Sequence, residues 1–254
     1  MLRDIVIKSR WSNEMSPAEI EDWRNVVNSV FGFFCTDDYF KRKYLDNIFG
    51  PSLLTVVYFN DKPIAADAFW RNDISGIESY QTTDTCVLSE YRRKGIYSAM
   101  LSDHLLNPIL AKRFIYGFPN SNSYPCRIRM GWDHRLLYKH PVLLPFMFCG
   151  SLPVIHADYA LWWLSSRSRV FRWNNLGKYF LVRKTTLNRV FCILGRIDKE
   201  TALKFPKVER IPILTYHYSF KPNALGRIAN PVPVVYYNGR SIANNVEFWN
   251  VDFV

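Results

Sequence analysis

Apolar residues near the start of the chain recur at helical spacing. Residues 16–19 (Ser-Pro-Ala-Glu) place a capping serine, a proline at the first helical position and a glutamate at the third, which marks a helix N-terminus. The apolar residues that follow at intervals of three or four are Ile20, Trp23, Val27 and Val30. This pattern predicts a helix that ends near Phe31 and a second helix over residues 37–48, before Gly50-Pro51. Weak alternation over residues 4–8 predicts a short first strand.

The pattern then changes to one that is typical of strands. Segment 53–59 is rich in β-branched and aromatic residues, and segments 64–70 and 77–87 follow it after polar turns. This order predicts an antiparallel meander with a long last strand. A helix that Pro108 closes comes next, and a short strand follows over residues 114–118. The residues on the buried face of that helix are Ile96, Met100, Leu101 and Leu105.

The second half of the chain is mainly strand-like. The predicted strands lie at residues 179–183, 190–197, 211–218, 234–237 and 246–251. A short helix is predicted over residues 198–204, and residues 165–169 are the most loop-like segment near the middle. The boundary between the two halves is therefore expected around residues 145–165.

Composition and charge narrow the class of protein. With 254 residues, 48% of them hydrophobic and 22% charged, the chain is long enough for a folded core in one or two domains. The net charge of +11 favours anionic partners such as nucleotide phosphates, nucleic acid or an anionic membrane surface, although a solvated basic surface explains it as well. The five cysteines form no Cys-x-x-Cys pair, and the five histidines show no metal spacing, so we expect neither a disulfide framework nor a metal.

Residues 141–164 are largely apolar and raise the question of a membrane span. Prolines and a glycine interrupt the segment, and His156 and Asp158 lie inside it, whereas a spanning helix needs about 20 mostly uninterrupted apolar residues. We interpret the segment as a buried connector between the two halves. The first residues have no signal-peptide pattern, so we expect no transmembrane segment and a cytoplasmic location.

The most informative stretch of the sequence joins the long strand to the helix that follows it. Residues 92–98 (Arg-Arg-Lys-Gly-Ile-Tyr-Ser) form a basic, glycine-containing turn at the predicted helix start. Backbone N–H groups at a helix N-terminus have no partner within the helix, and the helix dipole adds partial positive charge there. The turn therefore suits a phosphate or a pyrophosphate.

These features resemble the GCN5-related N-acetyltransferase superfamily. The residues that carry the resemblance are Val87, the turn 92–98, Asn120 and Gly131-Trp132, and the likeness covers residues 1–140. Segment 117–125 is similar to a branch found in bacterial surface-polysaccharide biosynthesis. The resemblance implies an α+β fold with a mixed, mostly antiparallel central sheet flanked by helices and a β-rich C-terminal extension. One interpretation of this extension is a degenerate second half with the same fold as the first. We expect an acyl-CoA-binding domain over residues 1–145 and a β-rich domain over residues 146–254 that contributes to the acceptor pocket.

The resemblance also implies a set of coenzyme A contacts. Backbone amides of residues 93–98 would hold the pyrophosphate, and the side chains of the turn would add positive charge. The backbone near Cys86 and Val87 would pair with the pantetheine arm and polarise the thioester carbonyl. Asn120 and Ser123 would line the other side of the channel. The turn residues assigned to acetyl-CoA binding are Arg92, Arg93, Lys94, Gly95, Ile96, Tyr97 and Ser98.

The sequence departs from the family pattern in two places. Tyr97 stands where the family prefers glycine or alanine, and its side chain is expected to crowd the turn. Arg127 and Ile128 occupy the positions where many members have a tyrosine that protonates the leaving thiolate. Tyr124 is the nearest phenol and becomes the candidate acid, the alternative being a tyrosine fixed in a Ser-Tyr-Pro turn.

An acceptor amine must lose a proton before it attacks, so a base is also needed. Asp84, three residues before Val87, is the first candidate, the alternative being a hydrogen bond across the sheet or at its edge, and Glu78 is the second candidate. The expected function is N-acetyl transfer from acetyl-CoA to an amine in a ternary complex, with a nucleotide-linked amino-sugar of cell-envelope polysaccharide synthesis as the acceptor and no nucleic acid as partner. The alternatives are a FemAB-like aminoacyl transferase that uses charged tRNA and a non-catalytic binding module of the same fold.

Overall fold

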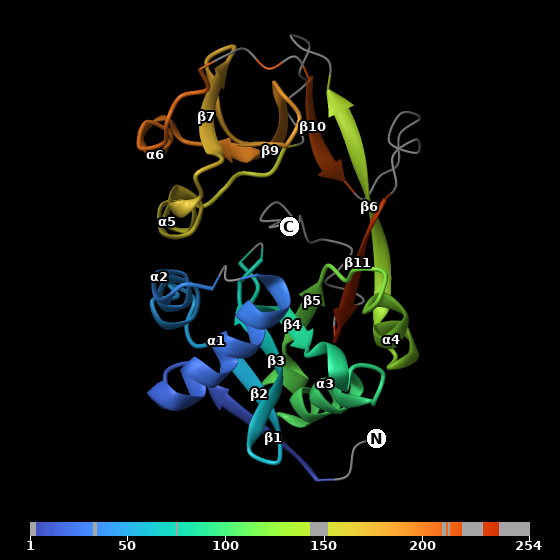
Figure 1. Ribbon diagram of the computed structural model, residues 1–254. Helices are drawn as coiled ribbons and strands as arrows, with labels where there is room; N and C mark the ends of the chain where they lie inside the picture. The colour runs from blue at the N-terminus through green and yellow to red at the C-terminus, as the bar shows by residue number, and fades with distance from the viewer. Residues whose placement is uncertain are drawn as a thin grey trace. The chain divides into compact units, whose positions relative to one another are not determined.

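The computed structural model describes residues 4–32, 35–74, 76–142, 152–209, 212, 214–219 and 231–238 (Figure 1). The chain divides into two compact units. The first comprises Met1–His134 and Val234–Val246, and the second comprises Arg135–Pro233 and Glu247–Val254. The units therefore divide after His134, whereas the predicted domain boundary lies after residue 145. In the part of the chain that the structure describes, no helix is long and apolar enough to cross a membrane.

A mostly antiparallel sheet forms the centre of the first unit. Its strands, in sheet order, are β1 (Ile5–Trp11), β2 (Leu53–Phe59), β3 (Lys62–Arg71), β4 (Ser79–Val87), β5 (Phe114–Gly117) and β11 (Val232–Tyr237). Strands β1 to β4 form the predicted antiparallel meander, β5 lies parallel to β4, and β11 pairs antiparallel with β5. The predicted α+β fold with a mostly antiparallel sheet is confirmed.

Helices of the first unit cover both faces of this sheet. They are α1 (Pro17–Phe31), α2 (Asp37–Phe40), the π-helical turn η1 (Lys41–Leu45), the short η2 (Ser89–Tyr91), α3 (Ile96–Leu106), η3 (Leu110–Lys112) and α4 (Tyr124–Arg129). Successive side chains of a strand point to opposite faces. Trp70 of β3 donates its indole N–H to the carbonyl of Lys43 in η1, while the neighbouring Phe69 contacts the His104 ring of α3. The η1 side and α3 therefore lie on opposite faces.

The capping signals of α1 act as predicted. The side chain of Ser16 accepts a hydrogen bond from the Glu19 N–H, and the Glu19 carboxylate accepts one from the Ser16 N–H. The prediction of a helix over residues 37–48 is wrong in extent. The observed helix ends at Leu45 and consists of one α turn followed by one π turn. Asn47 ends it, since its side chain accepts from the Phe49 N–H and donates to the Arg71 carbonyl.

The second unit contains its own sheet, as the β-rich prediction required. Its strands, in sheet order, are β6 (Asp133–Val142), β10 (Leu214–Ser219), β9 (Val190–Ile197), β8 (Lys178–Lys184) and β7 (Val170–Asn175). The short helices of this unit are α5 (Ala157–Trp162), η5 (Leu164–Ser166) and α6 (Lys199–Ala202). Its core cluster consists of Leu152, Phe180, Val182, Phe191 and Ile193.

Several predictions for the later part of the chain need correction. The patterns of α4, β6, β7 and α5 were not recognised as helices or strands, and the connector predicted over residues 141–164 in fact contains α5. The predicted strand at 246–251, the segment 143–151 of the connector and part of the predicted strand at 211–218 lie outside the described residues.

Candidate functional site

Strands β4 and β5 separate in the middle of the first sheet. Their parallel register runs from Ser79 opposite Phe114 to Thr82 opposite Gly117 and stops there. Strand β4 continues to Val87, but over residues 83–87 it pairs with β3 alone. Among the described strands, none pairs with this second edge of β4, although Nε of Arg92 donates to the Val87 carbonyl at 3.0 Å.

Gly117 allows the two strands to approach closely just before they separate. A Cβ atom at this position would lie 2.1 Å from Oγ1 of Thr82. Only glycine fits such an approach without displacing the neighbouring side chain. Gly117 therefore permits the close contact with Thr82 at the last paired position of the two strands.

A β-bulge occurs in the open half of β4. Cys86 pairs with Ala66 and Thr83 pairs with Ala68, so three steps along β4 match two steps along β3. The extra residue is accommodated at Asp84, whose φ of 51° is left-handed. The bulge directs two neighbouring side chains to different partners, since Asp84 bonds to Lys43 and Thr85 bonds to Asp67.

The predicted phosphate turn follows the open edge and remains exposed. Arg93 has φ 61° and Gly95 has φ 81°, and no side chain caps the N-terminus of α3. The first backbone bond of the helix is donated by the Ala99 N–H to the Gly95 carbonyl at 3.0 Å, so the three amides before Ala99 have no partner within the helix. Residues 92–95 are all exposed. The structure thus places unbonded donors and positive charge at one helix start.

Tyr97 does not lie over this turn, contrary to the expectation that it crowds it. Its ring is half-buried and packs against apolar core clusters, including Ile96 and Met100 of its own helix. The Arg127 guanidinium lies 5.9 Å from the ring centroid. Burial raises the pKa of Tyr97 to about 12, against the opposing effect of Arg127. The bulky residue therefore serves packing and leaves the N–H groups of the turn accessible.

The residues predicted on the β5 side build the start of α4. The Asn120 side-chain oxygen accepts from the N–H groups of Asn122 and Ser123, each at 3.0 Å. The Ser123 hydroxyl also donates to it at 3.2 Å. These bonds form the turn that begins the helix and occupy the Asn120 oxygen. Contact of Asn120 and Ser123 with a pantetheine arm stays a prediction. Because the Asn120 side-chain oxygen is occupied, its amide nitrogen would have to make the hydrogen bond to the ligand.

Tyr124 and Arg127 lie on α4. The half-buried Tyr124 ring meets the His134 ring edge-on with centroids 5.7 Å apart. Arg127 is 3% exposed, and its guanidinium lies 4.6 Å from the Trp132 ring. Arg127, one of the two residues at which the resemblance implies a tyrosine, is thus a buried cation between aromatic rings. Sequence reasoning named Arg127 only as a departure, since nothing in the pattern indicated its burial.

Asp84 is held in a buried ionic cluster. Its carboxylate accepts from the Lys43 ammonium at 2.8 Å and from the Tyr44 hydroxyl, and its side chain is 9% exposed. Burial alone would lower the pKa of Lys43, but the interactions with Asp84 and Tyr39 outweigh burial, so the pKa is raised. Burial and Asp84 together raise the pKa of Tyr44. The role of Asp84 as the base stays a prediction. To act as the base, its carboxylate would have to give up its bonds to Lys43 and Tyr44 and accept a proton from the acceptor amine. No local pattern in the sequence indicated that Lys43 and Tyr44 would meet Asp84.

The other candidate groups on β4 have structural partners. Glu78 precedes the strand at the end away from the turn, where it bonds to Arg71 at 2.6 Å and to Arg113 at 2.5 Å. Cys86 is buried, and burial, followed by the charge of Asp84, raises the pKa of its thiol. A neutral buried thiol is a poor nucleophile, so the Cys86 side chain is better suited to packing than to covalent catalysis. Within the described ranges, no group of three or more His, Cys, Asp or Glu residues could hold a metal ion.

The fold of this chain is that of the GCN5-related N-acetyltransferases. A GCN5-related N-acetyltransferase from Kribbella flavida is 10% identical, with a TM-score of 0.58 over 92% of this chain and 71% of that chain. A protein of unknown function from Enterococcus faecalis V583, described as a probable N-acyltransferase, is 14% identical, with a TM-score of 0.58 over 92% and 72%. A GCN5-related N-acetyltransferase from Anabaena variabilis ATCC 29413 is 12% identical, with a TM-score of 0.56 over 91% and 72%.

No protein-family model and no curated protein sequence matches this chain. At 10–14% identity, the solved structures show the fold alone. They confirm the predicted fold class. The link to surface-polysaccharide biosynthesis stays a prediction.

Proposed function

We propose that this protein is an N-acyltransferase that moves an acetyl group from acetyl-CoA to an amine by direct attack in a ternary complex. The observation that carries the proposal is the continuity of two features of the first unit. The unpaired edge of β4 over residues 83–87 leads into the exposed basic turn 92–95, and unbonded amides of α3 follow at once. An extended ligand with a diphosphate at one end matches this order of donors.

The chain supplies a distinct function along each part of this surface. The amides at the start of α3, with Arg92, Arg93 and Lys94, would bind the diphosphate and the 3′-phosphate. Edge groups of β4 near Cys86 and Val87 would hydrogen-bond the pantetheine amides and donate to the thioester oxygen as negative charge develops on it. Asp84 as base and Tyr124 as acid complete the proposed set.

For the acceptor, we infer an amino-sugar of cell-envelope polysaccharide synthesis from segment 117–125 alone, which is a resemblance and not a contact. Release of free coenzyme A over a panel of amino-sugars, polyamines and amino acids tests the acceptor class. Turnover confined to polyamines or amino acids would contradict it while leaving acetyl transfer intact.

Ligand-induced thermal stabilisation tests the donor. Acetyl-CoA at 100 times its dissociation constant should stabilise the protein by about 2.7 kcal/mol. The S-acetyl thioester of N-acetylcysteamine, which has the thioester but no diphosphate, is the matched control and should give no shift. Absence of any shift with millimolar acetyl-CoA would count against the proposed function.

The net charge of +11 favours a second candidate, an aminoacyl transferase that uses charged tRNA. Binding of tRNA that weakens steeply with salt, without any binding of acetyl-CoA, would favour this candidate. A non-catalytic module is the third. The inward side chain of Tyr97 removes one reason for it, and the absence of a tyrosine at positions 127 and 128 is the reason that remains.

A further inference from the structure

A row of polar side chains crosses the buried face of the first sheet beneath α3. Ser9 of β1 pairs with Thr55 of β2, and Thr55 pairs with Asp67 of β3. The Ser9 and Thr55 hydroxyls are 2.7 Å apart. Thr85, from the bulge of β4, donates its hydroxyl to Oδ1 of Asp67 at 2.5 Å. Thr55 and Asp67 are both 0% exposed, so four strands place polar groups in line on an otherwise apolar face.

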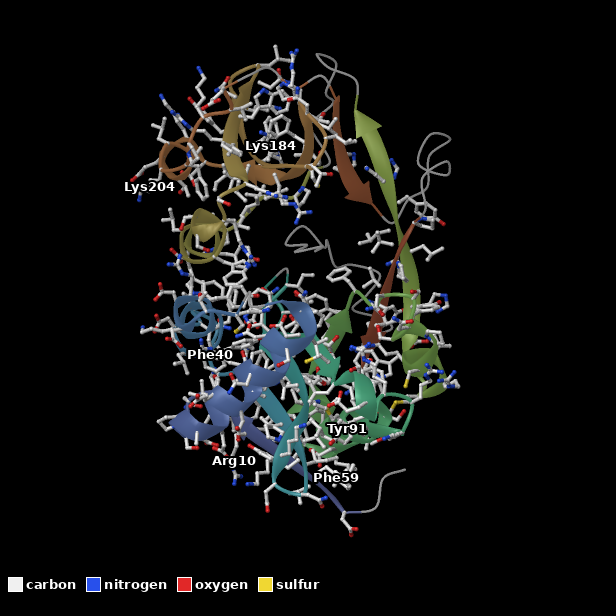
Figure 2. All side chains as sticks on the ribbon, in the orientation of Figure 1. Arg10, Phe40, Phe59, Tyr91, Lys184 and Lys204 are labelled. Carbon is white, nitrogen blue, oxygen red and sulfur yellow. The ribbon has the colours of Figure 1, made fainter. Side chains whose placement is uncertain are left out.

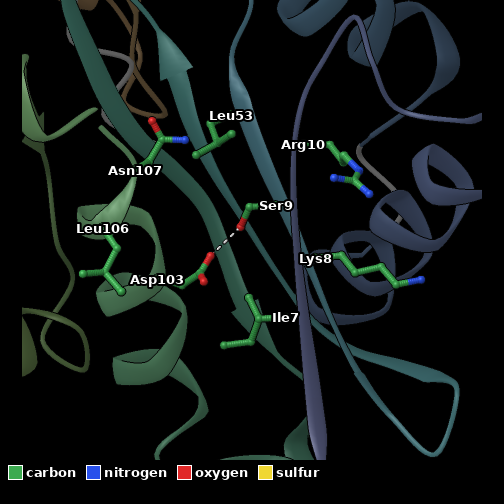
Figure 3. A pocket seen from close by; sticks show the side chains of 8 residues that line it. All are labelled: Ile7, Lys8, Ser9, Arg10, Leu53, Asp103, Leu106 and Asn107. Atoms are coloured by element: carbon green, nitrogen blue, oxygen red, sulfur yellow. Dashed lines mark hydrogen bonds between the residues drawn. The ribbon is translucent and has the colours of Figure 1, made fainter. Parts of the chain in front are cut away.

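Helix α3 joins this row through two residues on its inner side. Nδ1 of His104 lies 3.3 Å from Oδ2 of Asp67, and its Nε2 hydrogen-bonds the Thr55 hydroxyl. Ser9 donates its hydroxyl to Oδ2 of Asp103 at 2.8 Å, as Figure 3 shows. His104 is fully buried, with the Phe69 ring against it at 4.3 Å. These contacts link the side chains in the order Thr85–Asp67–His104–Thr55–Ser9–Asp103. The Asp67–His104 step is an ion-pair distance, since neither of its two facing atoms has a hydrogen-bond partner among the described residues.

The outer end of this chain opens into a pocket on the first unit. Ser9 and Asp103 line a cavity of about 420 Å³ between β1 and α3, together with Leu53, Leu106 and Asn107 (Figure 3). Leu106 is 81% exposed, which places this cavity at the surface. The inner end is Thr85, whose neighbour Cys86 lies on the open edge of β4.

A buried carboxylate requires compensation. Among the described residues, His104 is the ionisable group within 4 Å of the Asp67 carboxylate. The carboxylate also accepts hydrogen bonds from the Thr85 hydroxyl and from the Ala68 N–H, both at its Oδ1 atom. The other ionisable groups near the pair are Asp103 on the same helix, and Cys86 and Tyr97, whose pKa values are raised chiefly by burial and to a lesser extent by the charge of Asp67.

We propose that this chain of side chains is a proton path, in which Asp67 and His104 pass a proton between the bulge of β4 and the pocket at Asp103. The proposal rests on the proposed function. A protonated amine that becomes an amide loses two protons, of which the departing thiolate takes one, so each turnover must release one proton to solvent. Asp67 and His104 act as relay and positioning residues, and neither has to touch the substrate.

Thr55→Val tests the path, because valine keeps the shape of threonine and removes the hydroxyl that joins His104 to Ser9. We expect kcat to fall on the order of 10²-fold, with an altered pH profile and with KM for acetyl-CoA unchanged. Thr55→Ser retains the hydroxyl and should restore wild-type kcat. Equal kcat values and pH profiles for Thr55→Val and the wild type would overturn the path and leave the proposed function standing.

A second measurement does not depend on turnover. Exchange of the His104 ring N–H with water, followed by NMR and assigned with His104→Gln, should be slower in Thr55→Val than in the wild type because the route to solvent is cut. A hydrogen bond with a merely structural role predicts the opposite, since its loss loosens the site. Faster exchange in Thr55→Val therefore overturns the proton path. This outcome can be read without any turnover. Failure to acetylate any amine would refute the proposed function instead.

Discussion

At the scale of single residues, burial decides what each candidate group can do. Lys43 and Asp84 have side chains that are 4% and 9% exposed and bond to each other at 2.8 Å. Lys41 and Asp46, only a few residues away, form a pair whose side chains are 61% and 53% exposed. The ring of Phe40, labelled in Figure 2, packs next to this cluster against the rings of Trp23 and Tyr44, with centroids 5.6 and 5.3 Å away. The two pairs have the same chemistry in different surroundings.

Lys43→Met should therefore destabilise the protein strongly. Loss of one partner leaves the other as a buried, uncompensated charge, which typically lowers the free energy of unfolding by about 3–5 kcal/mol. Lys41→Met is the matched control and should change it by less than about 1 kcal/mol. Urea unfolding at pH 7 measures both, and equal effects would show that Asp84 finds another donor.

At the scale of elements, the turn before α3 depends on left-handed backbone geometry. Gly95 has φ 81° there, and Gly32 has φ 85° at the C-terminal end of α1. An alanine at either position would be strained by about 1–2 kcal/mol. The two glycines thus face the same conformational requirement in different places.

Gly95→Ala and Gly32→Ala should lower stability to a similar degree, while only the first should weaken acetyl-CoA binding. The reason is that the strain at Gly95 is relieved by movement of the amides that we assign to the diphosphate. Isothermal titration at matched fractions of folded protein measures the difference. Equal affinity in the two variants would show that this turn does not bind the ligand.

The separation of β4 and β5 provides a second test at this scale. Gly117→Ala places a methyl group on the Thr82 hydroxyl, so we expect a loss of about 1–3 kcal/mol from overpacking. Adding Thr82→Ala removes the hydroxyl and should recover most of that loss, whereas Thr82→Ser keeps it and should not. Thermal unfolding of the three variants separates the steric account from a general effect on β5.

At the scale of the whole molecule, buried ionisable groups set the response to alkali. Burial, followed by the charge of Asp84, raises the pKa of Cys35 from 9.0 to about 12. Cys86 and Tyr44 shift in the same direction. A group with a raised folded pKa adds stability that is fully present below its unfolded pKa and is lost as pH rises through the folded one.

The free energy of unfolding should therefore fall between about pH 9 and pH 12, by up to about 1.4 kcal/mol per pH unit for each such thiol. Cys35→Ala should reduce this slope by up to that amount, since it removes one titrating group. Urea unfolding from pH 7 to pH 11 measures the slope, and the offset at pH 7 reports the change in packing. An unchanged slope would contradict the shift assigned to Cys35.

The sequence by itself determined the features that depend on neighbouring residues. The capping box of α1, the meander from β2 to β4 and the basic turn before α3 are written in local spacing and turn chemistry, and each was predicted. The helix α4 and the strand β7 were missed because six residues carry too little periodicity to be recognised.

Only the tertiary structure decided which residues meet. Lys43 reaches Asp84 across 41 positions, and Thr55 reaches His104 across 49. The inward side chain of Tyr97 and the bulge at Asp84 depend on packing between elements, for which one sequence has no local signal. Short-range spacing fixes where a strand or helix forms, whereas the charge state and reactivity of a buried group depend on partners that folding brings from distant parts of the chain.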